Sequence, residues 1–219
     1  MPIRSVEIVI ETRFSVSVIY PAFSEEKTIA TVVKGCIPFA DEVLVVNDGS
    51  TDDTMINARG ARARVIELEH NMGVMKAIQC GLKEASGDII VTLDADGQHD
   101  PTEIPRLLQP ILEGKADLVM GERPSFPHLS EKILTLLTSL RVPCKDVSTG
   151  FRAIKRDIAE QMVLHGVCLC GTFVLEAGRY GARVTCVPIS IRERDDPRRI
   201  QMRHIHQFFI VLRDVVRFW

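Results

Sequence analysis

The chain has 219 residues, a formal net charge of −2, 46% hydrophobic and 26% charged residues, a composition typical of one soluble globular domain. This charge balance excludes a general affinity for nucleic acid, and no segment reaches the roughly 18 uncharged apolar residues that a membrane span needs. Residues 6–11 alternate apolar and charged side chains, so we expect no signal peptide. Six cysteines without C-x-x-C spacing predict free, buried thiols in a reduced compartment.

Strands and helices alternate in the first 121 residues. Short apolar segments predict strands at 14–20, 42–47, 64–68, 88–93 and 117–120. Helical patterns lie between them, at about 25–35, 52–60, 73–85 and 101–113. This alternation predicts an α/β fold with a mostly parallel, Rossmann-like central sheet flanked by helices. Ligands of such sheets bind beyond the carboxyl ends of the strands.

Polar residues follow the first two strands. In the segment after the first strand, Ser24 is suited to cap the next helix, and Ser50 or Thr51 can do the same after the second. Capping does not account for Asp48. An acid before a glycine at a strand tip is suited to accept hydrogen bonds from the base or ribose of a nucleotide, although a purely structural role is equally well supported.

The turn at 70–73 opens the third helix. A helix N-terminus that begins with Gly73 allows close approach and can face a diphosphate. Simple helix initiation explains the same residues equally well.

The fourth strand runs into a carboxylate-rich turn. In an extended chain Asp94 and Asp96 point the same way, so their charges require a nearby cation. Mg²⁺ or Mn²⁺ is suited to this place, because it takes oxygen ligands from one or two carboxylates and shares the rest of its shell with phosphates. Gln98 can add an amide oxygen. The alternative is that Asp96 and Asp100 only shape a turn and cap the helix that starts at Pro101.

The second half of the chain is expected to extend the same domain. Helices are predicted at 129–141, near 156–164 and near 172–180, with a strand within 182–191. A basic cluster then precedes apolar residues at helical spacing, which predicts a C-terminal amphipathic helix. Such a helix fits the surface of an anionic membrane. Packing of its apolar face on the sheet or at a subunit contact is the commoner arrangement.

Six motifs occur in the order and spacing of a known family. They are PAFSEE (21–26), VNDGSTDDT (46–54), NMG (71–73), DADGQHDP (94–101), GER (121–123) and STGFR (148–152). Over about 14–200 the chain resembles the family 2 glycosyltransferases of the GT-A fold, within them the dolichyl-phosphate mannosyltransferase or polyprenyl-phosphate glycosyltransferase branch. The resemblance implies one glycosyltransferase domain over 1–219, with a nucleotide-sugar-binding half at 12–121, an acceptor-side half at 122–200 and the amphipathic helix at 201–219.

The resemblance also implies a donor site. The expected donor is a nucleotide-diphosphate sugar, GDP-mannose or UDP-glucose, from which the hexose is transferred with inversion. Mg²⁺ or Mn²⁺ would act as a Lewis acid on the departing diphosphate. The residues expected to bind the donor are Pro21, Ala22, Glu25, Asp48, Gly73, Asp94, Ala95 and Asp96. The expected metal ligands are Asp94, Asp96 and Gln98.

The implied acceptor is a polyprenyl or dolichyl phosphate. Such a phosphate is already an anion near neutral pH, so the reaction needs cations to hold it and no protein base. The family pattern places Arg123, Arg152, Arg194 and Arg199 there. The catalytic residues would then be Asp94, Asp96, Arg123 and Arg152. We expect a cytoplasmic protein, and peripheral contact of its C-terminal helix with the inner face of the membrane stays open beside packing of that helix.

Two alternatives stay open. Transfer to a hydroxyl group of a glycan or small molecule would require a base, for which Asp146 is the candidate, although an acid there is equally a turn former. The segment between Arg123 and Asp146 is shorter than usual for the branch, which also allows a non-catalytic nucleotide-sugar-binding subunit. A nucleotidyltransferase is disfavoured, because no Gly-rich, Lys- or Arg-bearing loop follows the first strand.

Overall fold

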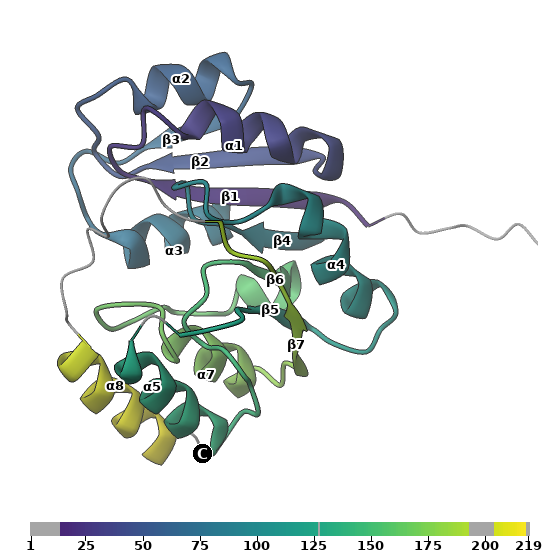
Figure 1. Ribbon diagram of the computed structural model, residues 1–219, viewed down its shortest axis with the longest axis vertical. Coiled ribbons are helices and arrows are strands. Elements are labelled where there is room, and N and C mark those ends of the chain that lie inside the picture. Colours follow the sequence, from purple (N-terminus) through teal and green to yellow (C-terminus); the bar gives the residue numbers. More distant parts are fainter. Residues whose placement is uncertain (1–13, 127, 193–203, 218–219) are drawn as a thin grey trace, which may run out of the picture.

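A central sheet organises the protein. The computed structural model describes residues 14–126, 128–192 and 204–217. The described residues form a seven-stranded sheet in the order β3-β2-β1-β4-β6-β5-β7 (Figure 1). The strands are β1 (Val16–Ala22), β2 (Glu42–Asn47), β3 (Arg64–Glu67), β4 (Ile89–Thr92), β5 (Leu118–Glu122), β6 (Arg152–Lys155) and β7 (Val184–Pro188). All neighbouring strands are parallel except β6, which runs antiparallel to β4 and β5.

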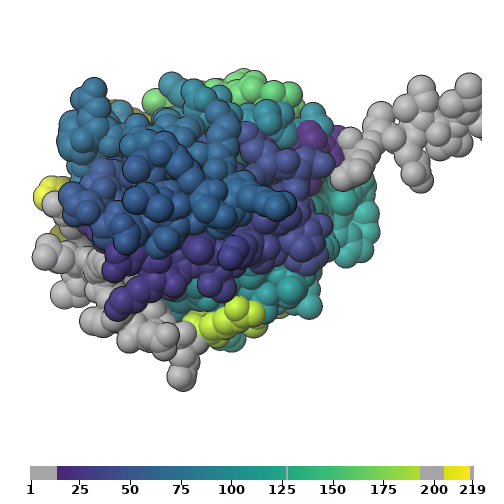
Figure 2. Space-filling model, turned by 90° about the horizontal axis from the view of Figure 1, so that it is seen from above, coloured from purple at the N-terminus to yellow at the C-terminus, as the bar shows by residue number. Residues whose placement is uncertain are grey.

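Helices cover both faces of the sheet. They are α1 (Ile29–Cys36), α2 (Thr54–Gly60), α3 (Val74–Glu84), α4 (Ile104–Leu112), α5 (Leu129–Ser139), α6 (Arg156–Ala159), α7 (Thr172–Arg179) and α8 (His204–Val216), with 3₁₀ turns η1 (Ile37–Phe39) and η2 (Pro101–Glu103). α1, α2 and α4 share a core with one face of the sheet, and α3 and α5 to α8 share a core with the other. Seen from above, the purple and blue N-terminal part of the chain covers most of the visible surface (Figure 2). The predicted α/β fold with a mostly parallel sheet is confirmed.

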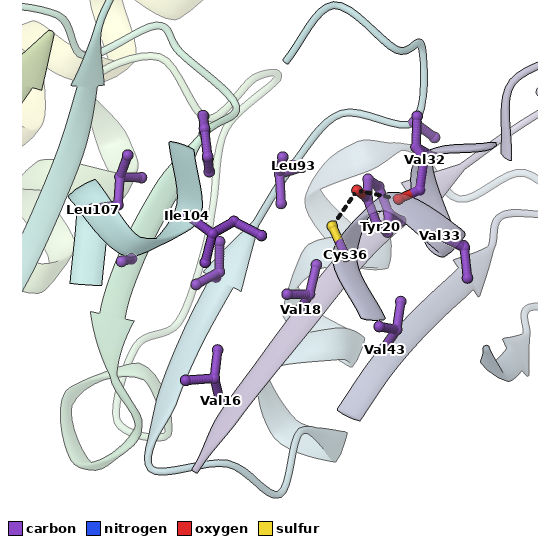
Figure 3. Packing of buried hydrophobic residues seen from close by; sticks show 14 of the residues in the cluster. Val16, Val18, Tyr20, Val32, Val33, Cys36, Val43, Leu93, Ile104 and Leu107 are labelled. Carbon is purple, nitrogen blue, oxygen red and sulfur yellow. Dashed lines mark hydrogen bonds between the residues drawn. The ribbon is translucent and has the colours of Figure 1, made fainter. Parts of the chain in front are cut away.

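The inner strands are apolar on both sides because both of their faces are buried. In β2, Val43 and Val45 belong to one core, whereas Leu44 and Val46 belong to the other. This double burial explains why the parallel strands read as continuous apolar runs. One polar group in the first core has its partners inside the core. The Tyr20 hydroxyl donates to the main-chain carbonyl of Val32 at 3.2 Å and lies 2.8 Å from the sulfur of Cys36 (Figure 3).

The sequence analysis missed β6. This strand has only two apolar residues, between Arg152 and Lys155, so no apolar run marks it. Its place is nevertheless central, because it separates the β1 to β4 part of the sheet from β5 and β7. β6 also carries the STGFR motif into the sheet, directly beside the end of β4.

Two of the predicted helix caps are wrong. Ser24 has a positive φ of 54°, and its N–H donates to the hydroxyl of Ser50 at 2.9 Å, while α1 begins only at Ile29. Ser50 therefore joins the loops after β1 and β2 instead of capping α2. Asp100 does cap the next helical turn, since its carboxylate accepts from the main-chain N–H of Thr102 at 3.0 Å.

Candidate active site

A cavity of about 670 Å³ lies at the carboxyl ends of β1, β2 and β4. This is the edge at which parallel sheets bind ligands. All eight residues predicted to bind the donor line its wall: Pro21, Ala22, Glu25, Asp48, Gly73, Asp94, Ala95 and Asp96. The cavity is also lined by residues 123–125, by His128 and Glu131, by the loop 148–150 and by two cysteines, Cys168 and Cys170.

Asp48 holds the wall of the predicted nucleotide pocket together. Its Oδ1 accepts from the main-chain N–H of Met72 at 2.7 Å and its Oδ2 from that of Gly73 at 2.8 Å. Gly49 permits this close approach, because a Cβ there would lie 2.6 Å from the main chain of the 70–73 loop and its φ is +71°. The Asp48 carboxylate thus ties the tip of β2 to the start of α3. Sequence reasoning did not predict these two partners.

A turn that follows β4 places Asp94 and Asp96 at the cavity. β4 ends at Thr92, and residues 95–96 form a turn, so the expected extended geometry is wrong. Both carboxylates still line the cavity, together with Gln98. The turn is closed by the N–H of Gln98, which donates to Oδ1 of Asp96 at 3.1 Å. Gln98 is further fixed by Arg192, whose N–H donates to the Gln98 carbonyl at 2.9 Å.

Asp94 sits in a closely fitted environment. A Cβ on Gly150 would lie 2.2 Å from Oδ2 of Asp94, so only glycine fits at that position. The Nε2 of His99 lies 3.6 Å from the same oxygen, and its ring packs on Phe151 with centroids 5.3 Å apart. Burial acts to raise the pKa of the Asp94 carboxyl, but His99 and then Arg152 outweigh it, so the pKa is lowered and the carboxylate stays ionised. Sequence reasoning did not single out His99 or the contact with Gly150.

The chemistry of this donor set fits a hard divalent cation. Within the described residues no group of three His, Cys, Asp or Glu side chains has the arrangement of a metal site. Asp94, Asp96 and Gln98 instead offer two carboxylates and an amide at one wall of the cavity. Mg²⁺ and Mn²⁺ are commonly held by few protein oxygens, with substrate phosphates completing the shell. The cavity leaves room for such phosphates.

Arg123 lines the cavity and is anchored by two acids. Its Nε donates to Asp146 at 2.6 Å, and its Nη2 donates to Glu131 at 2.7 Å. Burial acts to lower the pKa of Arg123, yet Asp146 and Glu131 raise it above its usual value. The guanidinium is therefore held in one orientation at the cavity wall.

The structure does not bring Arg152 to the cavity wall. Arg152 is only 2% exposed and is absent from the lining residues, and its guanidinium lies 4.6 Å above the ring of Phe173. Its Nε and Nη1 have no hydrogen-bond partner among the described residues. Burial lowers the pKa of Arg152, whereas nearby Asp94 acts to raise it. Arg194 and Arg199 lie outside the described residues.

The comparisons with known proteins identify the family. A mostly parallel sheet with a cavity and acids at the carboxyl ends of its strands has the arrangement of α/β proteins that bind ligands at this edge. Residues 17–135 match the glycosyl transferase family 2 model. The chain belongs to this family.

Curated relatives include enzymes named for lipid-phosphate acceptors. The chain is 34% identical over 134 residues to dodecaprenyl-phosphate galacturonate synthase of Rhizobium johnstonii, covering 56% of this chain and 37% of that protein. It is 30% identical over 174 residues to dolichol-phosphate mannosyltransferase of Pyrococcus furiosus, covering 69% and 49%. It is 32% identical over 204 residues to undecaprenyl-phosphate 4-deoxy-4-formamido-L-arabinose transferase of Salmonella choleraesuis, covering 82% and 60%. The chain thus spans 37% to 60% of the length of these relatives.

Solved structures share the fold. Glucosyl-3-phosphoglycerate synthase from Mycobacterium tuberculosis, in complex with Mn²⁺, UDP and glucosyl-3-phosphoglycerate, superimposes with a TM-score of 0.72 at 25% identity. The match covers 94% of this chain and 78% of that one. The fold is the GT-A fold of glycosyltransferases.

Proposed function

We propose that this glycosyltransferase moves a hexose, mannose or glucose, from a GDP or UDP donor to the phosphate of a polyprenyl or dolichyl phosphate, with Mg²⁺ or Mn²⁺ bound. The proposal rests on the observation that one cavity is lined by Asp94, Asp96 and Gln98, by the expected donor loops and by Arg123. The names of the polyprenyl- and dolichol-phosphate relatives support the acceptor class. The neighbour that holds Mn²⁺ and UDP supports a divalent cation.

On the donor side, the residues of this chain orient a charged leaving group. Asp94, Asp96 and Gln98 would hold the cation, which, when bound, neutralises the charge that develops on the departing nucleoside diphosphate. The Asp94 carboxylate is ionised at neutral pH even at its ordinary pKa, so it is available as a ligand, and the lowered pKa acts in the same direction. The loop fixed by Asp48 forms the adjoining wall for the nucleoside.

On the acceptor side, a phosphate anion needs positioning rather than deprotonation. A phosphate oxygen attacks the anomeric carbon from the face opposite the diphosphate, the carbon–oxygen bond to the diphosphate breaks, and the nucleoside diphosphate leaves. No proton has to move in this step. Arg123, fixed by its two acids, is the described cation best placed to receive the acceptor phosphate.

Donor and cation are tested together by calorimetry with GDP-mannose, UDP-glucose and UDP-N-acetylglucosamine, with and without Mn²⁺. We expect one donor to bind only with the cation and to transfer its sugar to a short-chain polyprenyl phosphate until EDTA is added. Asp96→Asn should lower transfer by about a hundredfold or more, because it removes a metal-binding charge. Asp53→Asn, at an exposed acid with no side-chain capping bond, is the matched control. Cation-independent transfer, or full activity of Asp96→Asn, would refute the metal assignment.

Transfer to a hydroxyl group is the second candidate. The mycobacterial neighbour has been crystallised with Mn²⁺, UDP-glucose and phosphoglyceric acid, which has a hydroxyl group that can accept a sugar. Such an acceptor needs a base, and the candidate Asp146 is already engaged by Arg123 at 2.6 Å. An acceptor panel decides between the two: transfer to phosphoglyceric acid but not to a polyprenyl phosphate would favour the hydroxyl acceptor.

A further inference from the structure

Helix α5 exposes a stripe of apolar residues and buries three polar ones beside Leu134. Leu129 and Leu136 are 72% and 71% exposed, and Ile133 and Leu140 lie on the same side at helical spacing. The buried side instead carries Glu131, Thr135 and Thr138. Glu131 faces inward because it pairs with Arg123 at the cavity. This pattern is the reverse of what burial in water favours.

Helix α8 shows the same inversion. Ile205 and Phe209 are 77% and 62% exposed, and Leu212 and Val216 continue the stripe. Gln207 and Asp214 are buried. Gln207 holds the loop 166–171, because it accepts from the N–H groups of Val167 and Cys168, each at 3.2 Å. Asp214 lies 2.6 Å from the ring of His165. The packing that the sequence analysis favoured is found for Val211 and Val215, which lie in the core, whereas the stripe of Ile205, Phe209, Leu212 and Val216 is left exposed.

The two stripes form one surface next to the cavity. Helices α5 and α8 lie side by side (Figure 1). Arg141, just after α5, donates to the carbonyl of Val215 near the end of α8, so the two helices end together. At their other ends His128 lines the cavity, and Gln207 donates to the carbonyl of Cys170, which also lines it. The surface is called here the α5–α8 face and consists of Leu129, Ile133, Leu136, Leu140, Ile205, Phe209, Leu212 and Val216.

The charges around the α5–α8 face are cationic. Lys132 and Arg217 are exposed on or directly after the two helices, and so is Arg213, whose guanidinium also pairs with Asp214 at 3.0 Å. Both acids within the helices, Glu131 and Asp214, are buried in ion pairs. Apolar side chains with a cationic border match a bilayer that contains anionic lipids, where the side chains enter the boundary of the acyl chains and the cations meet the headgroups. No helix of the described segments is long and apolar enough to cross such a bilayer.

We propose that the α5–α8 face docks on an anionic lipid surface and thereby places the mouth of the cavity against the membrane. The inference rests on the proposed function, since a polyprenyl phosphate keeps its chain in the bilayer. The face begins where the cavity opens, so the acceptor phosphate can enter the cavity while its apolar chain remains in the lipid.

The test is binding of the full chain to vesicles of phosphatidylcholine, alone or mixed with phosphatidylglycerol. We expect binding to the anionic vesicles that weakens with added salt. Phe209→Asp and Leu136→Asp should each lower partitioning by about tenfold, because each replaces an inserted apolar side chain by a charge of the wrong sign. Ile56→Asp is the matched control: Ile56 is also 62% exposed but lies on α2, across the sheet, and its replacement should change nothing.

The proposal fails if the wild-type chain does not bind anionic vesicles, or if Phe209→Asp binds as well as wild type. It also fails if the chain sediments as a dimer that Phe209→Asp dissociates, because a second copy would then cover the face. Transfer by the wild-type chain to a water-soluble, short-chain polyprenyl phosphate tests the proposed function separately. Transfer without vesicle binding overturns only the docking surface, and vesicle binding without transfer overturns only the acceptor.

Discussion

Arg123 and Asp146 form a two-point ion pair, with Nε 2.6 Å from Oδ2 and Nη2 3.0 Å from Oδ1. Asp146 also accepts from the N–H of Ser148 at 3.0 Å, and Arg123 reaches Glu131. A buried pair of this kind costs much to break on one side, because the remaining charge is left without a partner. The pair therefore joins the end of β5 to the loop that leads into β6, and it fixes the guanidinium at the cavity wall.

Replacing Asp146 separates a positioning role from a role as base. We expect Asp146→Asn to lower kcat/KM for a polyprenyl phosphate by about tenfold, because Arg123 keeps Glu131 but loses its second anchor. Loss of a general base would cost about a hundredfold to ten-thousandfold. Steady-state kinetics measure the difference. A loss in the larger range, with a changed pH profile, would favour a hydroxyl acceptor.

Replacing Arg123 should affect stability as well as transfer. Arg123→Ala leaves the buried acids Asp146 and Glu131 without their cation, so we expect the free energy of unfolding to fall by about 3 kcal/mol or more. Denaturant titration measures this change. The double variant Arg123→Leu with Asp146→Asn should regain part of the stability but not the activity. Full activity of the double variant would exclude Arg123 from acceptor binding.

Gly150 is expected to control the position of Asp94. The Cβ of Gly150→Ala would lie 2.2 Å from the Asp94 carboxylate, so the acid or the loop must move. A displacement of about 1 Å at a reacting site can cost about a hundredfold in rate. We expect a loss of that size in transfer, together with weaker Mn²⁺-dependent donor binding by calorimetry. Gly60→Ala is the control, because nothing lies within 4 Å of the added carbon, and it should transfer normally.

Asp48 is expected to matter for both donor binding and stability. Asp48→Ala removes the acceptors of the N–H groups of Met72 and Gly73, and loss of such charge-assisted bonds should cost about 2 kcal/mol or more in stability. The loop at the start of α3 should loosen and donor affinity should fall. Thermal unfolding and donor titration measure the two effects. Asp157→Ala, an exposed acid on α6, should leave donor affinity unchanged. Unchanged donor affinity in Asp48→Ala would restrict Asp48 to a structural role.

The sequence predicts those features of the fold that depend on residues close together in the chain. The parallel strands could be predicted because both of their faces are buried, which makes each strand an apolar run. Ligands of such sheets bind at the carboxyl ends of the strands, and this rule gave the position of the expected donor residues. Strand β6 could not be predicted, since its pairing with β4 and β5 depends on partners distant in the chain. The anchoring of Arg123 by Glu131 and Asp146 is equally non-local.

The orientation of α5 and α8 could not be predicted from the sequence either. Apolar spacing predicts an amphipathic helix but does not say which side faces the core. In α8 the buried positions of Gln207 and Asp214 are decided by partners in the loop 163–171. The stripe that contains Phe209 is therefore left outside.

The stability of the far end of the sheet should depend on pH through Asp117. Its carboxylate accepts from Arg183 at 2.7 and 2.9 Å and lies 2.7 Å from Nζ of Lys155. The hydrogen bonds from Arg183, followed by those from Lys155, outweigh burial and lower the pKa of Asp117 well below its usual range. A lowered pKa in the folded state means that the stabilisation is present above the unfolded value of about 3.9 and is lost as the pH falls below it.

We therefore expect Asp117→Asn to unfold more easily than wild type by about 2 kcal/mol at neutral pH. The difference should shrink as the pH is lowered below about 4, because the unfolded wild-type chain then binds a proton at Asp117 that the folded protein does not bind. Urea titrations of both proteins across this range measure it. Glu113→Gln provides the control: Glu113 pairs with Lys115 at the surface, at 2.7 Å, and removal of such an exposed pair should leave the midpoint nearly unchanged. A stability difference between wild type and Asp117→Asn that stays constant down to low pH would mean that the variant acts through packing and not through the charge of Asp117.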